Sequence, residues 1–360
     1  MRSGFEHRLS IAAALVEAAM PRHDDHARFA DFAALAPQIA AVAGHLKYQD
    51  PHRAGLMLGR CGANQRIRAD FASSERNLSD SLSLLETHLG PFHGDVAVTL
   101  THLGNLQEQL GQLDEAETSH QRAISIADDH SRDSAQLAAM LTSLGRVQES
   151  SGSLEQAEQT QLRALTINEK IHGPHHPSVA STLGNLGNVQ EQLGRLPQAE
   201  QTQLRALKIN EESHGADHPS VAISLTNLGR LQRRLGNLDE AESTQARALA
   251  IHEAVYGLDH PEVASTLSNL GNTQALLGRL EEAKQTHQRA LSINEGVYGL
   301  DHVSTALALA NIGGVQEKLG HLDDARDLVG RAHAIFSTAY GPQHPKTKQA
   351  RALLDHYAEP

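Results

Sequence analysis

Histidine is the residue type in this chain with the most capacity for chemistry, since 23 of its 360 residues are histidines. Two groups have spacing short enough to hold a metal ion: His172, His175 and His176, and the segment His23-Asp24-Asp25-His26. A metal site needs three or four converging ligands with ordered second shells. Most histidines instead recur at a fixed interval, which favours a row of imidazoles at helix starts over a metal cluster.

Other catalytic patterns are missing from the sequence. There is no nucleophile elbow, no His-Glu-x-x-His motif and no convincing pair of carboxylates. The single cysteine, Cys61, stands in an apolar helical register, where burial would leave its thiol inert. We therefore expect no enzymatic activity, no cofactor and no bound metal.

The residues are organised by an internal repeat, mostly of 42 residues. The repeat units begin near residues 51, 93, 134, 176, 218, 260 and 302. The marks of the repeat are His-Pro at 176, 218, 260 and 344, with His302 in the same register, and the glycine series Gly62, Gly104, Gly145, Gly187, Gly229, Gly271 and Gly313.

Each unit is predicted to form two helices. In the unit that begins at 176, apolar residues three or four apart predict a first helix over about 177–193, with proline at its first position. Gly194 ends it, and a second helix runs from about Leu196 to Gly215. Gly187 lies inside the first helix, where glycine costs about 1 kcal/mol relative to alanine. Close approach of the second helix explains that glycine, and the small residue Ala199 as well.

These features resemble tetratricopeptide repeats, with the longer 42-residue unit of the kinesin light chain and nephrocystin type. The resemblance rests on small-x-x-Leu-Gly in the first helix, on Ala and Ala-Leu in the second, and on Gly-x-Asp-His-Pro-x-Val-Ala joins. It implies an all-α fold: an α-solenoid, or right-handed superhelix, of antiparallel helix pairs. Seven repeats would cover residues 51–343, residues 344–360 would form a capping helix, and residues 1–50 would form a separate N-terminal helical segment.

The resemblance also implies a peptide-binding site in a concave groove lined by the first helices. Two positions before and one position after the repeated glycine would point inward, as would those four and five beyond it. The residues transferred in this way are Asn185, Asn227, Asn269, Asn311, Asn105, Arg146, Asn188, Arg230, Asn272, Arg233 and Arg234. Asparagine could clamp a peptide backbone, and the arginines could hold a carboxylate or a phosphate. The alternative is that these residues form a solvated helix face.

Two further series have structural interpretations. Where the family has a tyrosine, the first helices carry Gln65, Gln107, Gln148, Gln190, Gln232, Gln274 and Gln316. We expect these glutamines to hydrogen-bond between neighbouring repeats, because a buried amide needs partners. The second helices carry Arg122, Arg163, Arg205, Arg247, Arg289 and Arg331, which we expect to form ion pairs with glutamates of neighbouring repeats, Glu169, Glu211, Glu253 and Glu295.

Residues 1–50 resemble the linker that precedes the repeats in signalling ATPases of the STAND class. The resemblance rests on the order of an apolar helix that ends in Met20-Pro21, an acidic loop, and then Phe32-x-x-Leu35-x-Pro37 and a helix. The G-x-x-x-x-G-K-[ST] loop that such an ATPase needs to bind phosphates is absent. The chain would then be a sensor arm without its own nucleotide-binding module.

Composition narrows the class of partner. A net charge of −12 and 3% aromatic residues argue against nucleic-acid binding. No run approaches the length of about 18 apolar residues that a bilayer requires, and Glu17 interrupts the most apolar early segment. We therefore expect a cytoplasmic protein with no nucleic-acid or membrane partner.

The sequence thus predicts a non-enzymatic adaptor that binds a peptide or helix of a partner protein in its groove. The alternative is a regulatory arm related to STAND-type ATPases. A third hypothesis is an enzyme or metal protein that uses the histidines. Self-association through the ends of the array is compatible with any of them.

Overall fold

The structure, a computed structural model, describes residues 2–19, 29–130 and 134–358, and these residues form seventeen helices. The helices are α1 (Arg2–Ala19), α2 (Phe29–Leu46), α3 (Pro51–Ile67), α4 (Phe71–Leu89), α5 (Gly94–Gln109), α6 (Leu113–His130), α7 (Ala135–Ser150), α8 (Leu154–His172), α9 (Pro177–Gln192), α10 (Leu196–His214), α11 (Pro219–Leu235), α12 (Leu238–Tyr256), α13 (Pro261–Leu276), α14 (Leu280–Tyr298), α15 (Val303–Lys318), α16 (Leu322–Tyr340) and α17 (Pro345–Ala358).

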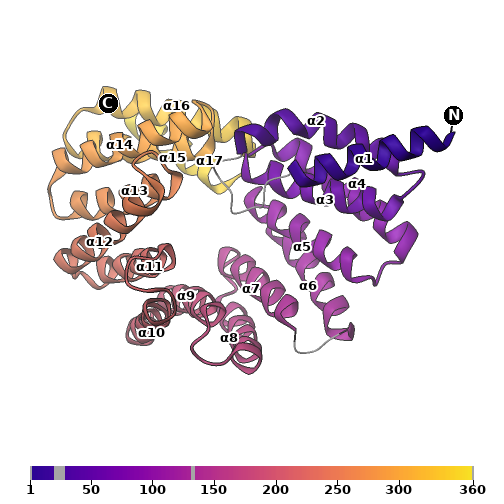
Figure 1. Cartoon of the computed structure of the whole chain (residues 1–360). Helices are drawn as coiled ribbons and strands as arrows, with labels where there is room; N and C mark the ends of the chain where they lie inside the picture. The colour runs from indigo at the N-terminus through magenta and orange to yellow at the C-terminus, as the bar shows by residue number, and fades with distance from the viewer. Residues whose placement is uncertain (1, 20–28, 131–133, 359–360) are drawn as a thin grey trace. The chain divides into compact units, whose positions relative to one another are not determined.

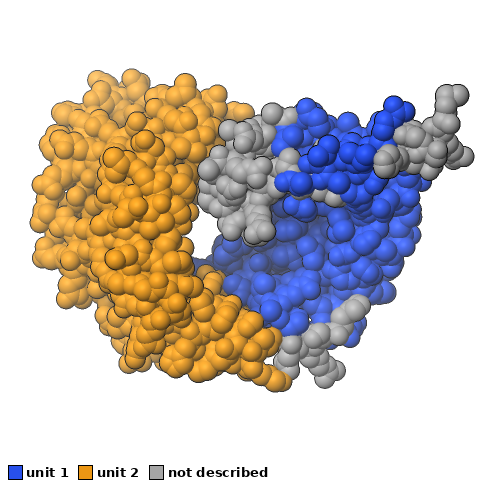
Figure 2. Space-filling view, in the orientation of Figure 1, with its two compact units in different colours: residues 1–151 blue, residues 152–360 orange. Residues whose placement is uncertain are grey.

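The helices form two compact units (Figure 1). Unit 1 is Met1–Ser151 and contains α1 to α7, and unit 2 is Gly152–Pro360 and contains α8 to α17 (Figure 2). Within each unit the odd-numbered helices from α3 to α15 are the first helices of successive pairs, and the even-numbered helices are the second helices. Within each unit consecutive helices pack together, so the fold is the all-α solenoid of helix pairs that the sequence predicts.

The glycine inside each first helix is explained by close approach of the second helix. A Cβ atom built on Gly229 would lie 2.7 Å from Cγ of Gln245 and 3.3 Å from the carbonyl oxygen of Ala241. Both distances are shorter than normal carbon contacts. The glycine therefore makes room for a side chain of the second helix that is fully buried at Gln245. The turn glycines have a different role: Gly194, at φ +74°, has the left-handed conformation that ends the first helix.

The first helices also pack against one another. Contacts join α3 to α5, α5 to α7, α9 to α11, α11 to α13 and α13 to α15. Among the described helices, no second helix contacts the second helix of the next pair to that extent. The pairs are thus closer together on the first-helix side, so the first helices line the inner side of the curve within each unit.

The glutamine series is bonded differently from the prediction. Asn77 Nδ2, Ser119 Oγ, Thr202 Oγ1 and Thr286 Oγ1 donate to Oε1 of Gln65, Gln107, Gln190 and Gln274, at 2.7, 2.7, 2.7 and 2.8 Å. Each donor belongs to the second helix of the same pair, so the predicted bonds between repeats are wrong at these positions. The close approach of the two helices within a pair directs the glutamines into their own hairpin. Gln148 is an exception, since its Nε2 donates to Glu117 of the preceding pair at 3.3 Å.

The arginine series forms the predicted ion pairs between neighbouring repeats. In unit 2 Arg205, Arg247, Arg289 and Arg331 pair with Glu169, Glu211, Glu253 and Glu295, at 2.6, 2.8, 2.5 and 3.6 Å. These arginines are 39–53% exposed, so each pair contributes only about 0–1 kcal/mol. Their repetition fixes the register of successive second helices more than it adds stability.

Helices α1, α2 and α17 pack against neighbouring helices of the repeats. Leu9 of α1 and Ile39 and Ala43 of α2 share a buried cluster with Met57 and Cys61 of α3. Ala350 and Tyr357 of α17 join a cluster with α15 and α16. The assignment of residues 1–50 as a separate segment and of residues 344–360 as a cap stays a prediction. No described helix is long and apolar enough to cross a membrane.

Candidate functional site

Arg230 of α11 connects its helix to the preceding first helix, α9. Its guanidinium lies 2.7 Å from Oε2 of Glu191 and donates to Oδ1 of Asn188 at 2.6 Å. Gln203 of α10 donates to the same Asn188 oxygen at 3.0 Å. Asn188 and Arg230 occupy the same register in successive repeats, so the sequence places both correctly on one face. The structure shows in addition that they bind each other.

Glu191 is the counter-ion of an arginine cluster. It is only 1% exposed and also lies 3.4 Å from Arg234. Burial is the main cause that lowers the pKa of Arg233, and the positive charge of Arg230 lowers it further. The charge of Glu191 acts in the opposite direction and raises this pKa. In the described part of the chain the buried Nε of Arg233 has no hydrogen-bond partner. One carboxylate thus faces three guanidiniums, so the cluster keeps an excess of positive charge in an acidic protein.

Unit 1 contains a similar arrangement at Arg146. This arginine donates to Oδ1 of Asn105 at 3.0 Å and lies 2.7 Å from Oε2 of Glu108. Burial raises the pKa of Glu108, while Arg146 and Arg66 lower it. Arg66 has its own pKa lowered by burial and then by Arg146. Asn105 and Arg146 are therefore engaged within the protein, as Asn188 and Arg230 are in unit 2.

The asparagines two positions before the glycine behave differently. Asn185, Asn227 and Asn311 are half-buried on α9, α11 and α15, and their side chains make no hydrogen bond within the described part of the chain. Asn269 donates only to the carbonyl of Ser265 in its own helix, at 3.2 Å. Asn272, in the other register of α13, is also half-buried. Unit 2 therefore carries a row of amides with few or no hydrogen bonds to the rest of the described chain, which we call the asparagine row: Asn185, Asn227, Asn269 and Asn311.

Exposed apolar residues lie one helical turn before two members of this row. Ile223 is 53% exposed and precedes Asn227 by four residues, and Leu307 is 40% exposed and precedes Asn311 by four. Residues four apart lie on the same helix face. Ile223 and Leu307 were not predicted as site residues from the sequence. The available signal was that neighbouring repeats carry serines, Ser181 and Ser265, at the equivalent positions.

The histidines at the joins are structural in the part of the chain that the structure describes. His176, His218, His260 and His302 are the N-cap residues of α9, α11, α13 and α15. No group of three histidine, cysteine or acidic side chains among the described residues could hold a metal ion, and His23-Asp24-Asp25-His26 lies outside those residues. Cys61 is fully buried, and burial followed by the charge of Asp70 raises its pKa to about 12. A buried thiol with a raised pKa stays protonated at neutral pH, which disfavours its reaction as a nucleophile.

Sequence comparison decides the family. The tetratricopeptide repeat family matches residues 54–129, 136–212, 191–252, 232–296 and 262–338. The chain belongs to the tetratricopeptide repeat family. The resemblance seen in the repeated residues is therefore confirmed over most of the chain. A search of curated proteins gives no match.

Several solved structures share this fold. A Rap protein in complex with competence and sporulation factor is 15% identical and covers 98% of both chains, with a TM-score of 0.58. A chain of the APC/C hetero-tetramer Cut9–Hcn1 is 15% identical, and the match covers 91% of this chain and 53% of that chain, with a TM-score of 0.52. BtubC (BKLC) from P. vanneervenii is 23% identical and covers 66% of this chain and 93% of its own, with a TM-score of 0.50. At these identities the similarity concerns the fold.

The buried carboxylate gives a stability prediction for these tetratricopeptide repeats. Glu191→Gln is expected to lower the free energy of unfolding by about 1–2 kcal/mol, because Arg230 and Arg234 lose a buried anionic partner but still reach solvent. Urea unfolding monitored by circular dichroism measures the change. Glu158→Gln is the control, since Glu158 pairs with the 43% exposed Arg195 and its loss should cost less than about 1 kcal/mol. Equal losses in the two variants would contradict a special role for Glu191.

Proposed function

We propose that the chain is a non-enzymatic scaffold that binds an extended peptide segment of a partner protein along the first-helix face of unit 2. The observation that carries the proposal is the asparagine row. An asparagine amide offers both a donor and an acceptor, which matches the backbone of an extended peptide. Three of the four amides make no bond within the described chain, so binding would not have to break an existing contact.

The arginine cluster gives the peptide a chemical preference. Arg230, Arg233 and Arg234 share one buried carboxylate, so an anionic group of the ligand would find uncompensated positive charge. Guanidinium binds carboxylates and phosphates with two parallel hydrogen bonds. Ile223, one turn from Asn227, offers an apolar contact beside the cluster. The preferred segment is therefore extended, with an acidic or phosphorylated residue near an apolar one.

Family and fold support a binding role without identifying the partner. The family match is to tetratricopeptide repeats, and one similar structure is a Rap protein complexed with competence and sporulation factor. Another is a hetero-tetramer of Cut9 and Hcn1. A stack of helix pairs presents side chains on a rigid surface, which suits recognition without a chemical step.

Changing Asn185, Asn227 and Asn269 together to alanine is expected to weaken partner binding about tenfold or more, since each removes one or more hydrogen bonds to the peptide. The full chain and the variant are immobilised side by side in cell extract, and retained proteins are quantified by mass spectrometry. The affinity of peptides from any differentially retained protein is then measured by fluorescence anisotropy. The circular dichroism spectrum and the urea midpoint should stay unchanged.

The matched control changes the exposed second-helix residues Gln156, Gln159 and Gln201 to alanine, which removes three amides from the other face of unit 2. This variant should retain the same proteins as the wild type. If the asparagine variant also retains them with unchanged affinity, the assignment of the site to the first-helix face is wrong.

The alternative function, a regulatory arm related to STAND-type ATPases, rests on the order of helices in residues 1–50. Leu35 and Pro37 lie in α2, while the side chain of Phe32 lies outside the described part. The same capture experiment distinguishes the two functions, because specific retention of a P-loop ATPase would favour the regulatory arm over a general adaptor.

A further inference from the structure

Histidine side chains cap the N-termini of five helices in unit 2. His176, His218, His260, His302 and His344 precede α9, α11, α13, α15 and α17, and in each case Nδ1 accepts the backbone N–H two residues further on. The donors are Ser178, Ser220, Glu262, Ser304 and Lys346, at 3.1, 3.2, 3.2, 3.1 and 3.2 Å. An Nδ1 that accepts a hydrogen bond carries no proton, so these bonds require a neutral imidazole with its proton on Nε2.

Each capping ring is also stacked on a second ring, four residues earlier in the preceding helix. The partners are His172, His214, Tyr256, Tyr298 and Tyr340, with ring centroids 4.3, 4.2, 4.3, 4.3 and 4.1 Å away. Protonation of a cap would remove the acceptor of the helix N–H. It would also place a positive charge at the positive end of the helix dipole. At His176 and His218 the stacked partner is itself an imidazole, so a second charge would add repulsion.

Charged groups near the caps act in both directions. His214 and burial lower the pKa of His218, with burial the larger cause. Further titratable groups adjoin the caps. His172 and His175 adjoin His176, and Asp217 and Arg247 adjoin His218. Tyr256, His252, Asp259 and Glu262 adjoin His260. Tyr298 and Asp301 adjoin His302, and Tyr340 and Lys346 adjoin His344. Glu262 and the exposed aspartates would favour protonation. They do not replace the acceptor that protonation removes.

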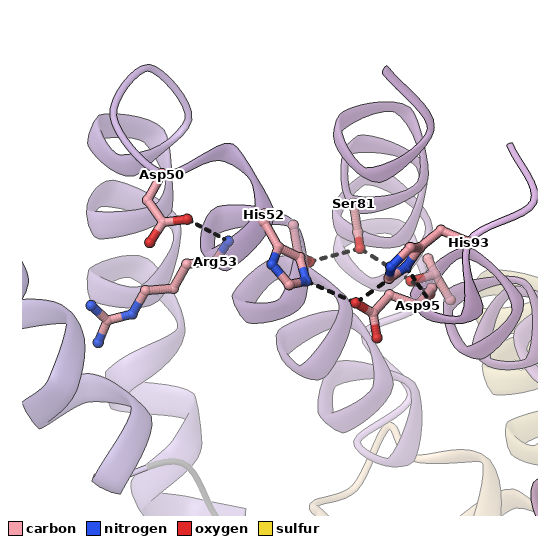
Figure 3. Close-up of polar contacts among 8 residues, drawn as sticks. Asp50, His52, Arg53, Ser81, His93 and Asp95 are labelled. Atoms are coloured by element: carbon pink, nitrogen blue, oxygen red, sulfur yellow. Dashed lines mark hydrogen bonds and ion pairs between the residues drawn. The ribbon is translucent and has the colours of Figure 1, made fainter. Parts of the chain in front are cut away.

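Unit 1 uses different caps for the same purpose. Asp50 accepts from the N–H of Arg53 at 3.1 Å, and Ser134 accepts from that of Leu137 at 3.0 Å. A carboxylate oxygen and a hydroxyl oxygen accept this hydrogen bond without an imidazole that could be protonated. His93 is an imidazole cap, but its Nδ1 lies 3.5 Å from the carboxylate of Asp95, which also bonds His52 (Figure 3). An imidazolium at His93 would therefore keep an attractive partner.

We propose that the five imidazole caps form a pH-sensitive switch in unit 2, in which protonation releases the first turns of α9, α11, α13, α15 and α17 and loosens the stack of repeats. Histidine is the side chain that most readily changes charge near neutral pH, so lowering the pH from 7.5 to 5.5 is the condition that tests the switch. Because each repeat contacts only its neighbours, the five losses add along the unit. An N-cap contributes a factor of about five to local helix stability, which sets the expected size of each loss. The proposal does not depend on peptide binding.

Hydrogen exchange of the full chain tests the switch. The starting protein carries His120→Gln, His252→Asn and His287→Gln, so that the buried imidazoles do not contribute to the pH response. Glutamine and asparagine are chosen because other repeats carry them at the equivalent positions. Exchange is followed at pH 7.5 and 5.5 and corrected for the chemical rate. The first turns of the five capped helices should lose protection about fivefold or more at pH 5.5. Those of α3 and α7, capped by Asp50 and Ser134, should keep theirs.

Cap exchange supplies the decisive comparison. Changing the five caps to aspartate, as in the Asp50-Pro51 join of this chain, should abolish the loss of protection in unit 2. His175→Asp, at a 74% exposed imidazole that caps no helix, should leave the loss unchanged. If the fivefold variant fails to fold, His218→Asp alone should protect the start of α11 and no other helix start. Equal loss of protection in the starting protein and the cap variants would overturn the proposal, as would equal loss in the two units.

Discussion

Lowering the pH from 7.5 to 5 is expected to reduce the free energy of unfolding by about 2 kcal/mol at each of two buried histidines, His120 and His287. Both side chains are fully buried, and neither ring nitrogen of either has a hydrogen-bond partner within the described chain. Burial lowers the pKa of each to about 4, with the charge of Arg146 a lesser cause at His120. The unfolded chain binds protons near pH 6.5 and the folded chain does not. Stability is therefore complete above pH 6.5 and is lost progressively as the pH falls toward 4.

The double variant His120→Gln and His287→Gln should lose less stability on acidification than the wild type. Glutamine is the matched replacement, because Gln203 and Gln245 fill the equivalent space against Gly187 and Gly229. The measurement is the urea midpoint of both proteins at pH 7.5 and pH 5. The N-cap histidines are present in both proteins, so their contribution cancels in the comparison. An identical acid response in the two proteins would show that the buried imidazoles are not responsible.

Two adjacent glycines in α15 are expected to respond to alanine with opposite signs. A Cβ on Gly313 would lie 2.7 Å from Cγ2 of Val329 and 3.4 Å from the carbonyl oxygen of Ala325. Val329 is fully buried and β-branched, so it has little freedom to move. Gly313→Ala should therefore lower the free energy of unfolding by about 1–3 kcal/mol, the cost of overpacking a core.

Gly314 provides the control from the same helix. A Cβ there meets nothing within 4 Å, so Gly314→Ala should raise the free energy of unfolding by about 0.5–1 kcal/mol through helix propensity alone. Thermal and urea unfolding of the two single variants give the comparison. A stabilising Gly313→Ala would mean that the helices of a pair can separate at little cost, contrary to the close approach that the repeated glycine indicates.

The candidate site combines two kinds of asparagine that the sequence does not separate. Asn185 and Asn188 lie one turn apart in the same helix, and the family pattern assigns both to the groove. Asn188 accepts from Arg230 and Gln203, whereas Asn185 makes no bond in the described chain. Substitution of Asn188 would therefore disturb the protein itself. The asparagine row is the cleaner place to test binding.

The sequence by itself determined the helix boundaries, the repeated ion pairs and the fold class, because these depend on local backbone preferences and on the regular repeat. The glycine and His-Pro spacing placed the helix boundaries in unit 2 within one or two residues, because proline at the first turn and a positive-φ glycine at the end depend only on the backbone nearby. Arg205 and Glu169 were predicted as an ion pair because a strict repeat carries each partner to the same place on every second helix. The fold class follows from the same regularity.

Only the tertiary structure decided which polar side chains are engaged. Whether Gln190 bonds its own hairpin or the next depends on how closely two helices approach, and the glycine opposite the second helix sets that distance. Glu191 is buried against arginines of another helix, and Arg234 is 43 residues further along the chain. His287 is buried against Gly271, which precedes it by 16 residues and lies in another helix. Sequence periodicity identifies the face on which a residue lies. The neighbour that meets it on that face is determined by packing.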